Sequence, residues 1–252
     1  MRARLFEGLD GLPKGLPIVV QGSIANHVRH SGAKKESIMF DLLNYLFVCK
    51  NAPYLVVPAF TFSVFSSLLF SPEARSEMGY ISRYVEDYTT YSRTSHPIYS
   101  FYCVSNPYKG ELTYPLNADS FYCFGDGTFY DYVAKSDAIQ VCLNLQDSKC
   151  MTFYHHAEKI FGAEHRQEKV FPVKTIRDNT SSETPCSVYV RKPGVVTKVD
   201  GIERMMWDEA VWRGQKPVVG NPTERWCHLT ECLRLFSGID MSDHRSLLYE
   251  VE

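Results

Sequence analysis

A histidine and a carboxylate three residues apart, His155 and Glu158, form the pattern in this chain that is best suited to acid–base chemistry. They follow an apolar, β-rich run, residues 138–145, and a short polar stretch, residues 146–150. This order predicts a buried strand, a polar loop and then the first turn of a helix, with Thr152 as a favourable N-cap. Residues three apart share one face of a helix, so the imidazole and the carboxylate should meet.

The predicted position at a helix start also bears on the charge of the histidine. The positive end of the helix dipole disfavours an imidazolium and would keep His155 neutral near pH 7, while Glu158 would fix its tautomer. A neutral, oriented imidazole at the carboxyl end of a strand is what a general base requires. The alternative is a histidine that plays only a structural part at the beginning of a helix.

The sequence around these residues resembles one enzyme family. The Thr-x-x-His-x-Ala-Glu motif at residues 152–158 is similar to the corresponding element of the aminoglycoside 3-N-acetyltransferases, which are acetyl-CoA-dependent antibiotic N-acetyltransferases. Three earlier segments resemble that family in the same order. Residues 18–24 match its first strand and Val-His-Ser-Ser-Leu turn, residues 55–63 a strand ending in a Pro-Thr-Phe-Thr-like turn, and residues 92–100 an Arg-Ser-x-His-Pro-x-x-Ser signature. The resemblance covers residues 17–165, and its most specific pieces are His-Pro and His-x-x-Glu.

The resemblance implies that an acetyl group passes directly from the thioester of acetyl-CoA to an amine. A protonated amine is unreactive, so a base must remove a proton during the attack, and His155 is the candidate with Glu158 as its orienter. The backbone amides near Thr152 would hold the oxygen of the tetrahedral intermediate. The Thr152 hydroxyl either assists them or only caps the helix. These three residues are the predicted catalytic set.

Coenzyme-binding residues are predicted in the first of these segments. Gly22, Ser23 and Ile24 form a turn after the predicted strand, and small residues with free amides at a helix start suit the coenzyme pyrophosphate. The family has a histidine and a serine where this chain has Gln21 and Gly22, so those two side-chain roles are lost here. An ordinary strand-to-helix turn is the structural interpretation of the same residues.

Acceptor-binding residues are expected in the two middle segments. The resemblance places His96, Thr61 and Ser63 in the acceptor pocket, and a histidine before a proline projects from a stiff, extended backbone. Arg93 adds a cation that would meet a phosphate of the coenzyme or an anionic group of the acceptor. In the alternative interpretation, Arg93 and His96 only tie down a long loop.

The charge of the loop region bears on which amine is acetylated. Its acidic residues are offset to a large extent by Arg75, Arg83, Arg93 and Lys109, which argues against a dedicated site for a polycation. The acids are Glu73, Glu77, Glu86, Asp87, Glu111, Asp119, Asp126 and Asp131. The expected acceptor is an amino sugar, free or nucleotide-linked, in a pocket that the clustered tyrosines of this region would line unless they serve only in packing. True aminoglycoside 3-N-acetylation, an antibiotic-resistance activity, is the alternative.

Two hypotheses from other functional classes remain. One is a cysteine-dependent hydrolase that pairs Cys150 or Cys123 with His155. The other is a non-catalytic sugar-binding module, which the presence of both His155 and Glu158 opposes.

Composition sets broad bounds on the protein. At 252 residues with 44% hydrophobic content, the chain is expected to form one acetyltransferase domain, residues 1–252, with a core at 1–165 and a divergent portion at 166–252. The net charge of −2 does not indicate a basic surface that would bind nucleic acid or an anionic membrane. No secretory segment or membrane-spanning apolar run is visible, so a cytoplasmic protein is expected, and a homodimer is compatible with the sequence.

The eight cysteines are expected to be buried or free thiols, because a chain of this size without an export signal is predicted to meet a reducing environment. No pair has Cys-x-x-Cys spacing. His155 and His156 diverge as neighbours on a helix, so no metal is expected beside acetyl-CoA.

The periodicity of the chain predicts an α/β fold with a central mixed sheet flanked by helices, long functional loops and a C-terminal portion built from a β-hairpin and helices. The expected strands are residues 16–20, 54–57 and 138–145, with an amphipathic helix at 37–48 and long ordered loops with short helices at 71–117. The hairpin is expected from strands 170–177 and 187–192 with a polar turn at 179–185, followed by helices at 207–212 and 223–236.

Overall fold

The computed structural model describes residues 5–110, 120–178, 180–241 and 249–251. Its centre is a seven-stranded mixed sheet with the order β12-β13-β6-β1-β2-β5-β4. Strand β1 (Ile18–Gly22) runs parallel to both of its neighbours, β2 (Tyr54–Pro58) and β6 (Ile139–Leu143). The outer strands are antiparallel: β5 (Phe101–Ser105), β4 (Ser92–Arg93), β13 (Glu224–His228) and β12 (Arg213–Gly214). The predicted α/β class with a mixed sheet is confirmed.

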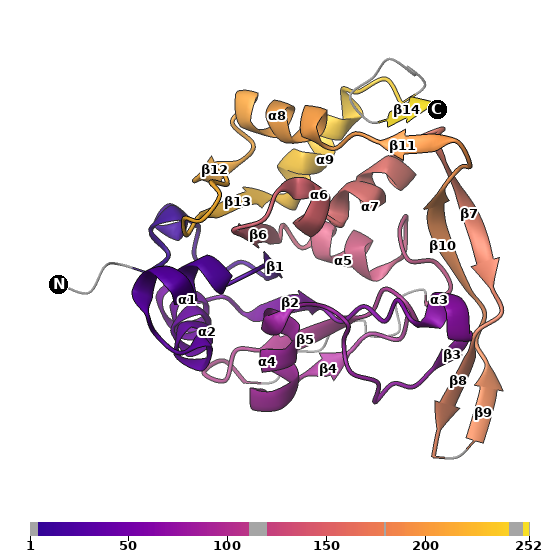
Figure 1. The fold of residues 1–252 in the computed structure, drawn as a ribbon, viewed down its shortest axis with the longest axis horizontal. Helices are drawn as coiled ribbons and strands as arrows, with labels where there is room; N and C mark the ends of the chain where they lie inside the picture. Colours follow the sequence, from indigo (N-terminus) through magenta and orange to yellow (C-terminus); the bar gives the residue numbers. More distant parts are fainter. Residues whose placement is uncertain (1–4, 111–119, 179, 242–248, 252) are drawn as a thin grey trace.

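Helices cover both faces of this sheet, as Figure 1 shows. Successive residues of β1 point to opposite faces, so Ile18 and Val20 enter one hydrophobic core and Val19 enters the other. The first face is covered by α1 (Ala25–Ser31), α2 (Lys35–Asn44) and α4 (Tyr80–Tyr88). The second is covered by α5 (Phe129–Lys135), α7 (Phe153–Ile160), α8 (Asp200–Asp208) and α9 (Leu229–Ser237). Residues before and after position 165 therefore share the second core.

Shorter elements complete the main body. They are a 3₁₀ turn (Glu7–Leu9), a π turn (Tyr45–Cys49), α3 (Val64–Ser67), β3 (Leu69–Phe70) and α6 (Asp147–Cys150). Strand β11 (Val195–Thr197) pairs with β14 (Tyr249–Val251). No helix in the described ranges has the length and apolar character needed to cross a membrane.

The predicted hairpin runs along one side of the sheet, at the right of Figure 1. Strand β7 (Arg166–Phe171) pairs with β10 (Cys186–Arg191), and β8 (Lys174–Arg177) pairs with β9 (Thr180–Glu183). The hairpin is confirmed, but the strand expected at 170–177 is divided between the end of β7 and β8. The polar turn expected at 179–185 is wrong over most of its length, because residues 180–183 form a strand. Polar Thr and Ser residues are accommodated there because β9 is exposed on both faces. Position 179 lies outside the described residues.

The structure confirms the three predicted strands of the sheet and the helix at 37–48, with boundaries shifted by a few residues. Two helix predictions are wrong. The helix expected at 207–212 begins earlier, at Asp200, and ends at Asp208, shortly before Ala210 takes a positive φ of 53°. The first part of the helix expected at 223–236 is the buried strand β13. Its charged residues, Glu224 and Arg225, are not typical of a strand in the core, so the sequence did not indicate one.

The long segment 71–117 contains a short helix, α4, as expected, but it also contains strands that the sequence did not predict. The longer of these, β5, is a buried strand that pairs with β2 over its whole length. Residues 111–117 lie outside the described part of the chain.

Gly22 marks the closest approach between β1 and β6. Its φ of +122° is rarely adopted by other residues, and a Cβ at this position would overlap the backbone of Leu143. The next residue, Ser23, donates its amide to the Leu143 carbonyl at 2.9 Å, which extends the strand pairing by one bond. The glycine is therefore required by packing within the sheet.

We expect Gly22→Ala to lower the free energy of unfolding by about 3 kcal/mol or more, because it adds backbone strain to a steric overlap. Gly15→Ala is the matched control: Gly15 also has a positive φ, +81°, but open space around its Cβ position. Its cost should be about 1–2 kcal/mol, from the backbone alone. Urea denaturation of both variants measures the difference, and equal costs would show that the overlap with Leu143 is relieved easily.

Candidate functional site

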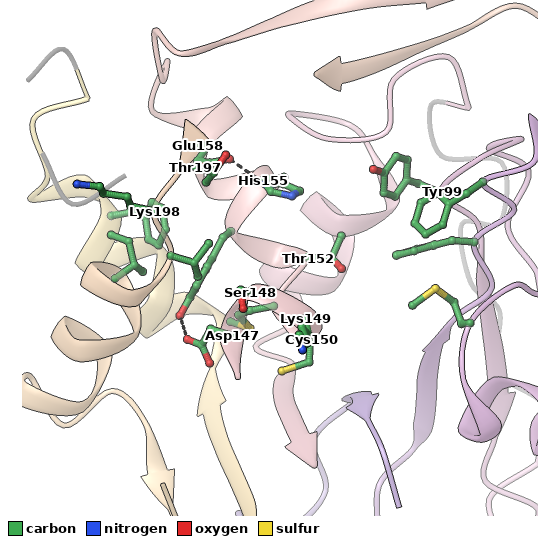
Figure 2. Close-up of a pocket in the computed structure, with 18 residues that line it drawn as sticks. Tyr99, Asp147, Ser148, Lys149, Cys150, Thr152, His155, Glu158, Thr197 and Lys198 are labelled. Atoms are coloured by element: carbon green, nitrogen blue, oxygen red, sulfur yellow. Dashed lines mark hydrogen bonds and ion pairs between the residues drawn. The ribbon is translucent and has the colours of Figure 1, made fainter. Parts of the chain in front are cut away.

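A cavity of about 230 Å³ opens beside the amino-terminal half of α7. Its lining comes from segments far apart in the sequence, including α6 and α7, the turn after β2, the residues before β5 and the end of β11. Figure 2 shows His155 and Thr152 between Tyr99 on one side and Thr197 and Lys198 on the other. The cavity is therefore lined by His155, the histidine that the sequence analysis proposed as the general base.

His155 and Glu158 meet as their spacing predicted. Nδ1 of His155 lies 2.9 Å from Oε2 of Glu158, and the imidazole keeps 29% of its surface exposed while the carboxylate keeps 3%. A carboxylate at Nδ1 accepts the proton there and leaves the Nε2 lone pair available to a ligand in the cavity. Burial lowers the pKa of His155, with the bond to Glu158 opposing it, so the ring is neutral at pH 7. The neutral state expected from the sequence thus has burial as a cause that the sequence did not reveal.

Glu158 is surrounded by nitrogen atoms. Nε of Arg166 lies 2.5 Å from Oε2, and Nε2 of His165 lies 3.3 Å from Oε1. Burial by itself raises the pKa of Glu158, but the bond to His155 and the nearby His165 and Arg166 outweigh it and hold this pKa well below its usual range. The carboxylate is therefore ionised at neutral pH, as an orienting partner of a histidine must be.

Thr152 precedes α7 as predicted, but its hydroxyl does not cap the helix. The polar loop expected at 146–150 is largely the short helix α6, which ends before Met151. The backbone of Thr152 is itself helical, with φ −58° and ψ −25°. Capping side chains normally sit on extended backbone. The hydroxyl instead accepts a hydrogen bond from Nε2 of Gln21 at 3.2 Å. Gln21 thus has a side-chain role that the sequence comparison had discounted.

The neighbouring His156 points away from His155. Its Nδ1 accepts the backbone amide of Gly125 at 3.2 Å, and burial lowers its pKa to about 4. The divergence expected of adjacent helical residues is confirmed.

Sequence reasoning missed a buried ion pair beside the cavity. Nη2 of Arg225, on β13, lies 2.6 Å from Oδ1 of Asp147, on α6, and both side chains are almost fully buried. Oδ2 of Asp147 accepts the indole N–H of Trp212 at 3.0 Å and the hydroxyl of Tyr154 on α7. The only sequence signal was a charged pair, Glu224 and Arg225, directly before Trp226 and Cys227.

The family model of the aminoglycoside 3-N-acetyltransferases matches residues 55–237, well over half of the chain. The chain belongs to the aminoglycoside 3-N-acetyltransferase family. It is therefore an N-acetyltransferase of the acetyl-CoA-dependent type, as the four sequence motifs predicted. The match also extends through most of the portion after residue 165, where we found almost no motif.

Solved structures of similar fold include other acetyltransferases. Aminoglycoside acetyltransferase AAC(3)-IIb gives a TM-score of 0.68 at 14% identity, covering 91% of this chain and 92% of its own. AAC-IIIb, solved as a binary complex with CoASH, gives 0.67 at 12% identity, with 90% of each chain covered. The YokD protein from Bacillus subtilis gives 0.64 at 15% identity, covering 90% of this chain and 92% of its own. No curated protein sequence matches the chain.

The guanidinium of Arg93 is fully hydrogen-bonded within the protein. All five of its N–H groups have acceptors, which are three backbone carbonyls and two hydroxyls. These acceptors belong to Ala59, Pro72, Ala74, Ser100 and Thr61. No donor is left for a phosphate, so the geometry supports the structural interpretation of this residue.

None of the three predicted acceptor-binding residues lines the cavity. Thr61 is buried and accepts Nη2 of Arg93 at 2.8 Å, whereas Ser63 donates its amide to Glu77 at 3.0 Å. Nδ1 of His96 accepts the amides of Ile98 and Tyr99 at 3.1 and 2.9 Å. Their neighbours Phe60, Phe62 and Tyr99 line the cavity instead. The motif residues therefore shape the turns that present these aromatic rings.

The turn at Gly22, Ser23 and Ile24 does not line the cavity. The amide of Ser23 is taken by Leu143, and the Ser23 hydroxyl accepts the amide of Ala25 at 3.2 Å. The free amides expected for a pyrophosphate are thus partly used within the protein.

The cysteines behave as buried hydrophobic residues or free thiols, as expected. All eight are free, and only Cys49 is exposed. Burial raises the pKa of Cys123 to about 12, and a hydrogen bond with Cys142 together with burial raises that of Cys150. A protonated thiol is a poor nucleophile, so these environments do not support the hydrolase alternative.

We expect Arg93→Lys to lower the free energy of unfolding by about 2–4 kcal/mol, because an ammonium cannot satisfy five acceptors. The affinity of the folded enzyme for coenzyme A should change less than about twofold, since no Arg93 donor is available to a phosphate. Urea denaturation and calorimetry measure the two quantities. Unchanged stability with weakened coenzyme binding would restore the predicted phosphate-binding role.

Proposed function

We propose that the protein transfers the acetyl group of acetyl-CoA directly to an amine of an amino sugar, with His155 as the general base. The observation that carries this proposal is the His155 ring, which lines the cavity with Nδ1 bonded to Glu158 and Nε2 left to accept a proton. Relatives of similar fold support the ligands: AAC-IIIb was solved with CoASH, AAC-VIa with sisomicin and AAC(3)-IVa with a gentamicin.

In the proposed reaction, Nε2 of His155 takes a proton from the amine as its nitrogen attacks the thioester carbonyl. A C–N bond forms, and the C–S bond breaks when the tetrahedral intermediate collapses. The proton then passes from the imidazolium to the departing thiolate, which leaves an amide and coenzyme A. Glu158 stabilises the imidazolium while it exists and keeps the ring oriented.

The oxygen of the intermediate is assigned to the beginning of α7. The amides of Tyr154 and His155 already donate to the carbonyls of Met151 and Thr152, at 3.1 and 3.0 Å. The amides of Thr152 and Phe153 are therefore the proposed oxyanion donors, and the bond from Gln21 to the Thr152 hydroxyl steadies this turn.

The charges around the cavity favour an acceptor that carries a phosphate. Its two described carboxylates are buried and paired, Asp147 with Arg225 and Glu158 with Arg166. Two basic side chains, Lys149 and Lys198, belong to the same lining. A polycation finds no unpaired carboxylate among the described lining residues, whereas an anionic amino sugar meets ammonium groups.

The alternative acceptor is a true aminoglycoside. It is favoured by the family and by the sisomicin and gentamicin complexes of the relatives. Two of the acidic residues weighed from the sequence, Glu111 and Asp119, lie outside the described residues. Kinetics with both acceptor classes therefore decide between the two acceptors.

We expect His155→Ala to lower kcat by about 10²–10⁴-fold while the affinity for coenzyme A stays nearly unchanged. Glu158→Gln should cost less, because the imidazole remains. His30→Ala, which removes an exposed histidine of α1, is the control and should leave turnover unchanged. A thiol-release assay measures turnover, and near-normal turnover of His155→Ala would place the base elsewhere.

We expect Lys149→Glu to lower kcat/KM for a UDP-linked amino sugar by about 10-fold or more, because a charge-assisted bond contributes about 1.5–3 kcal/mol. The ratio of kcat/KM for gentamicin to that for the UDP-linked sugar should rise. Lys35→Glu, an exposed lysine on α2, makes the same change in net charge and should leave both values unchanged. An increase in KM for acetyl-CoA alone would assign Lys149 to the coenzyme. Wild-type preference for gentamicin would identify an aminoglycoside-modifying enzyme.

A further inference from the structure

We propose that Arg166 is a positioning residue that keeps His155 a free base at neutral pH by neutralising the charge of Glu158. The inference rests on the proposed role of His155 as general base. Arg166 is outside every motif that the sequence suggested, and it reaches the site from the hairpin rather than from α7.

One carboxylate oxygen is shared between the histidine and the arginine. Oε2 of Glu158 lies 2.9 Å from Nδ1 of His155 and 2.5 Å from Nε of Arg166. The three side chains leave little room for water, since Glu158 and Arg166 are 3% and 6% exposed. The imidazole and the guanidinium therefore compete for the same negative charge.

The position of Arg166 is fixed by the hairpin. It is the first residue of β7, paired with Arg191 of β10, and its Nη1 donates to the carbonyl of Tyr189 at 3.3 Å. The guanidinium carbon also lies 6.0 Å from the centre of the Tyr189 ring. The arginine is thus held against Glu158 by contacts that do not involve α7.

The physical consequence follows from charge balance in a poorly solvated site. A buried carboxylate beside a lone histidine attracts a proton to the ring, because an imidazolium–carboxylate pair is neutral overall. With Arg166 in place the carboxylate is already neutralised, and a proton on His155 would give the three side chains a net positive charge. Arg166 therefore opposes protonation of the base, while Glu158 still fixes its tautomer.

Other titratable groups around the pair act in the same direction or not at all. His165 lies against the second carboxylate oxygen and stacks on Tyr249, with ring centres 4.4 Å apart. A proton on His165 would add positive charge, as Arg166 does. Burial raises the pKa of Tyr99 and of Tyr189 to about 12, so both stay neutral. Other charged groups near the site are Lys149 and Lys198 in the cavity lining, the Lys159–Glu168 ion pair at 2.6 Å and the buried Asp147–Arg225 pair.

The test is the acid limb of the pH profile of kcat/KM, which reports the pKa of the base in the free enzyme. Arg166→Gln should move this limb upward by about one pH unit or more, the size expected when a neighbouring charge is removed. Activity lost at pH 7 should then return at higher pH. Glu158→Gln should move the limb downward, and Arg166→Lys should keep it close to the wild-type position.

Arg191→Gln is the matched control. Arg191 is the partner of Arg166 in the β7–β10 register, but its side chain is exposed, so this variant should leave the limb in place. The position of the limb does not depend on the concentration of active enzyme, so partial unfolding of a variant does not affect the comparison. An Arg166→Gln enzyme with reduced activity at every pH and an unmoved limb would overturn the proposal and leave Arg166 as a structural residue.

Histidine NMR on the wild-type protein provides a measurement that does not depend on catalysis or on folding of a variant. The His155 ring should be neutral at pH 7, and an imidazolium at that pH would overturn the proposal. If His155→Ala retains turnover, the proposed role of His155 as general base is wrong. NMR titration of the His155 ring in the wild-type protein and in Arg166→Gln would still decide whether Arg166 controls its protonation.

Discussion

A carboxylate taken out of water requires positive charge or hydrogen-bond donors around it, and the candidate site is arranged around one such group, Glu158. Its partners come from three places: His155 on the same helix, His165 in the following turn and Arg166 at the start of the hairpin. Because one charge is shared by all of them, the orientation of the histidine depends on the docking of the hairpin. The hairpin therefore contacts the candidate site, although none of its strands belongs to the seven-stranded sheet.

A second buried charge pair holds the other end of the same segment. Asp147 and Arg225 join α6 to β13, and the bond from Tyr154 to Asp147 extends this connection into α7. Breaking such a pair by removing one partner typically costs about 3–5 kcal/mol. Both described carboxylates beside the cavity thus serve to position the histidine helix. Both carboxylates are therefore already paired with arginines of the protein itself.

The side chains of the family-signature residues Arg93 and His96 form hydrogen bonds with backbone groups of the protein. Arg93 joins loops that are distant in sequence, and His96 accepts two amides of the turn that presents Tyr99. Sequence motifs identify such residues as important but do not reveal whether they touch a ligand. The same limit applied to Thr61, which faces Arg93, while its neighbours Phe60 and Phe62 face the cavity.

The sequence alone determined the local features of this protein. Apolar periodicity identified the parallel strands and the helix at 37–48, and the spacing of His155 and Glu158 determined their contact, because these signals depend on neighbours along the chain. Strand β13 was mistaken for a helix, because Glu224 and Arg225 are satisfied only by distant partners. Only the tertiary structure showed that Arg166 contacts Glu158, that Asp147 pairs with Arg225 beside the cavity, and that Arg93 is hydrogen-bonded within its own loops, because pairing between segments far apart leaves no periodic signal.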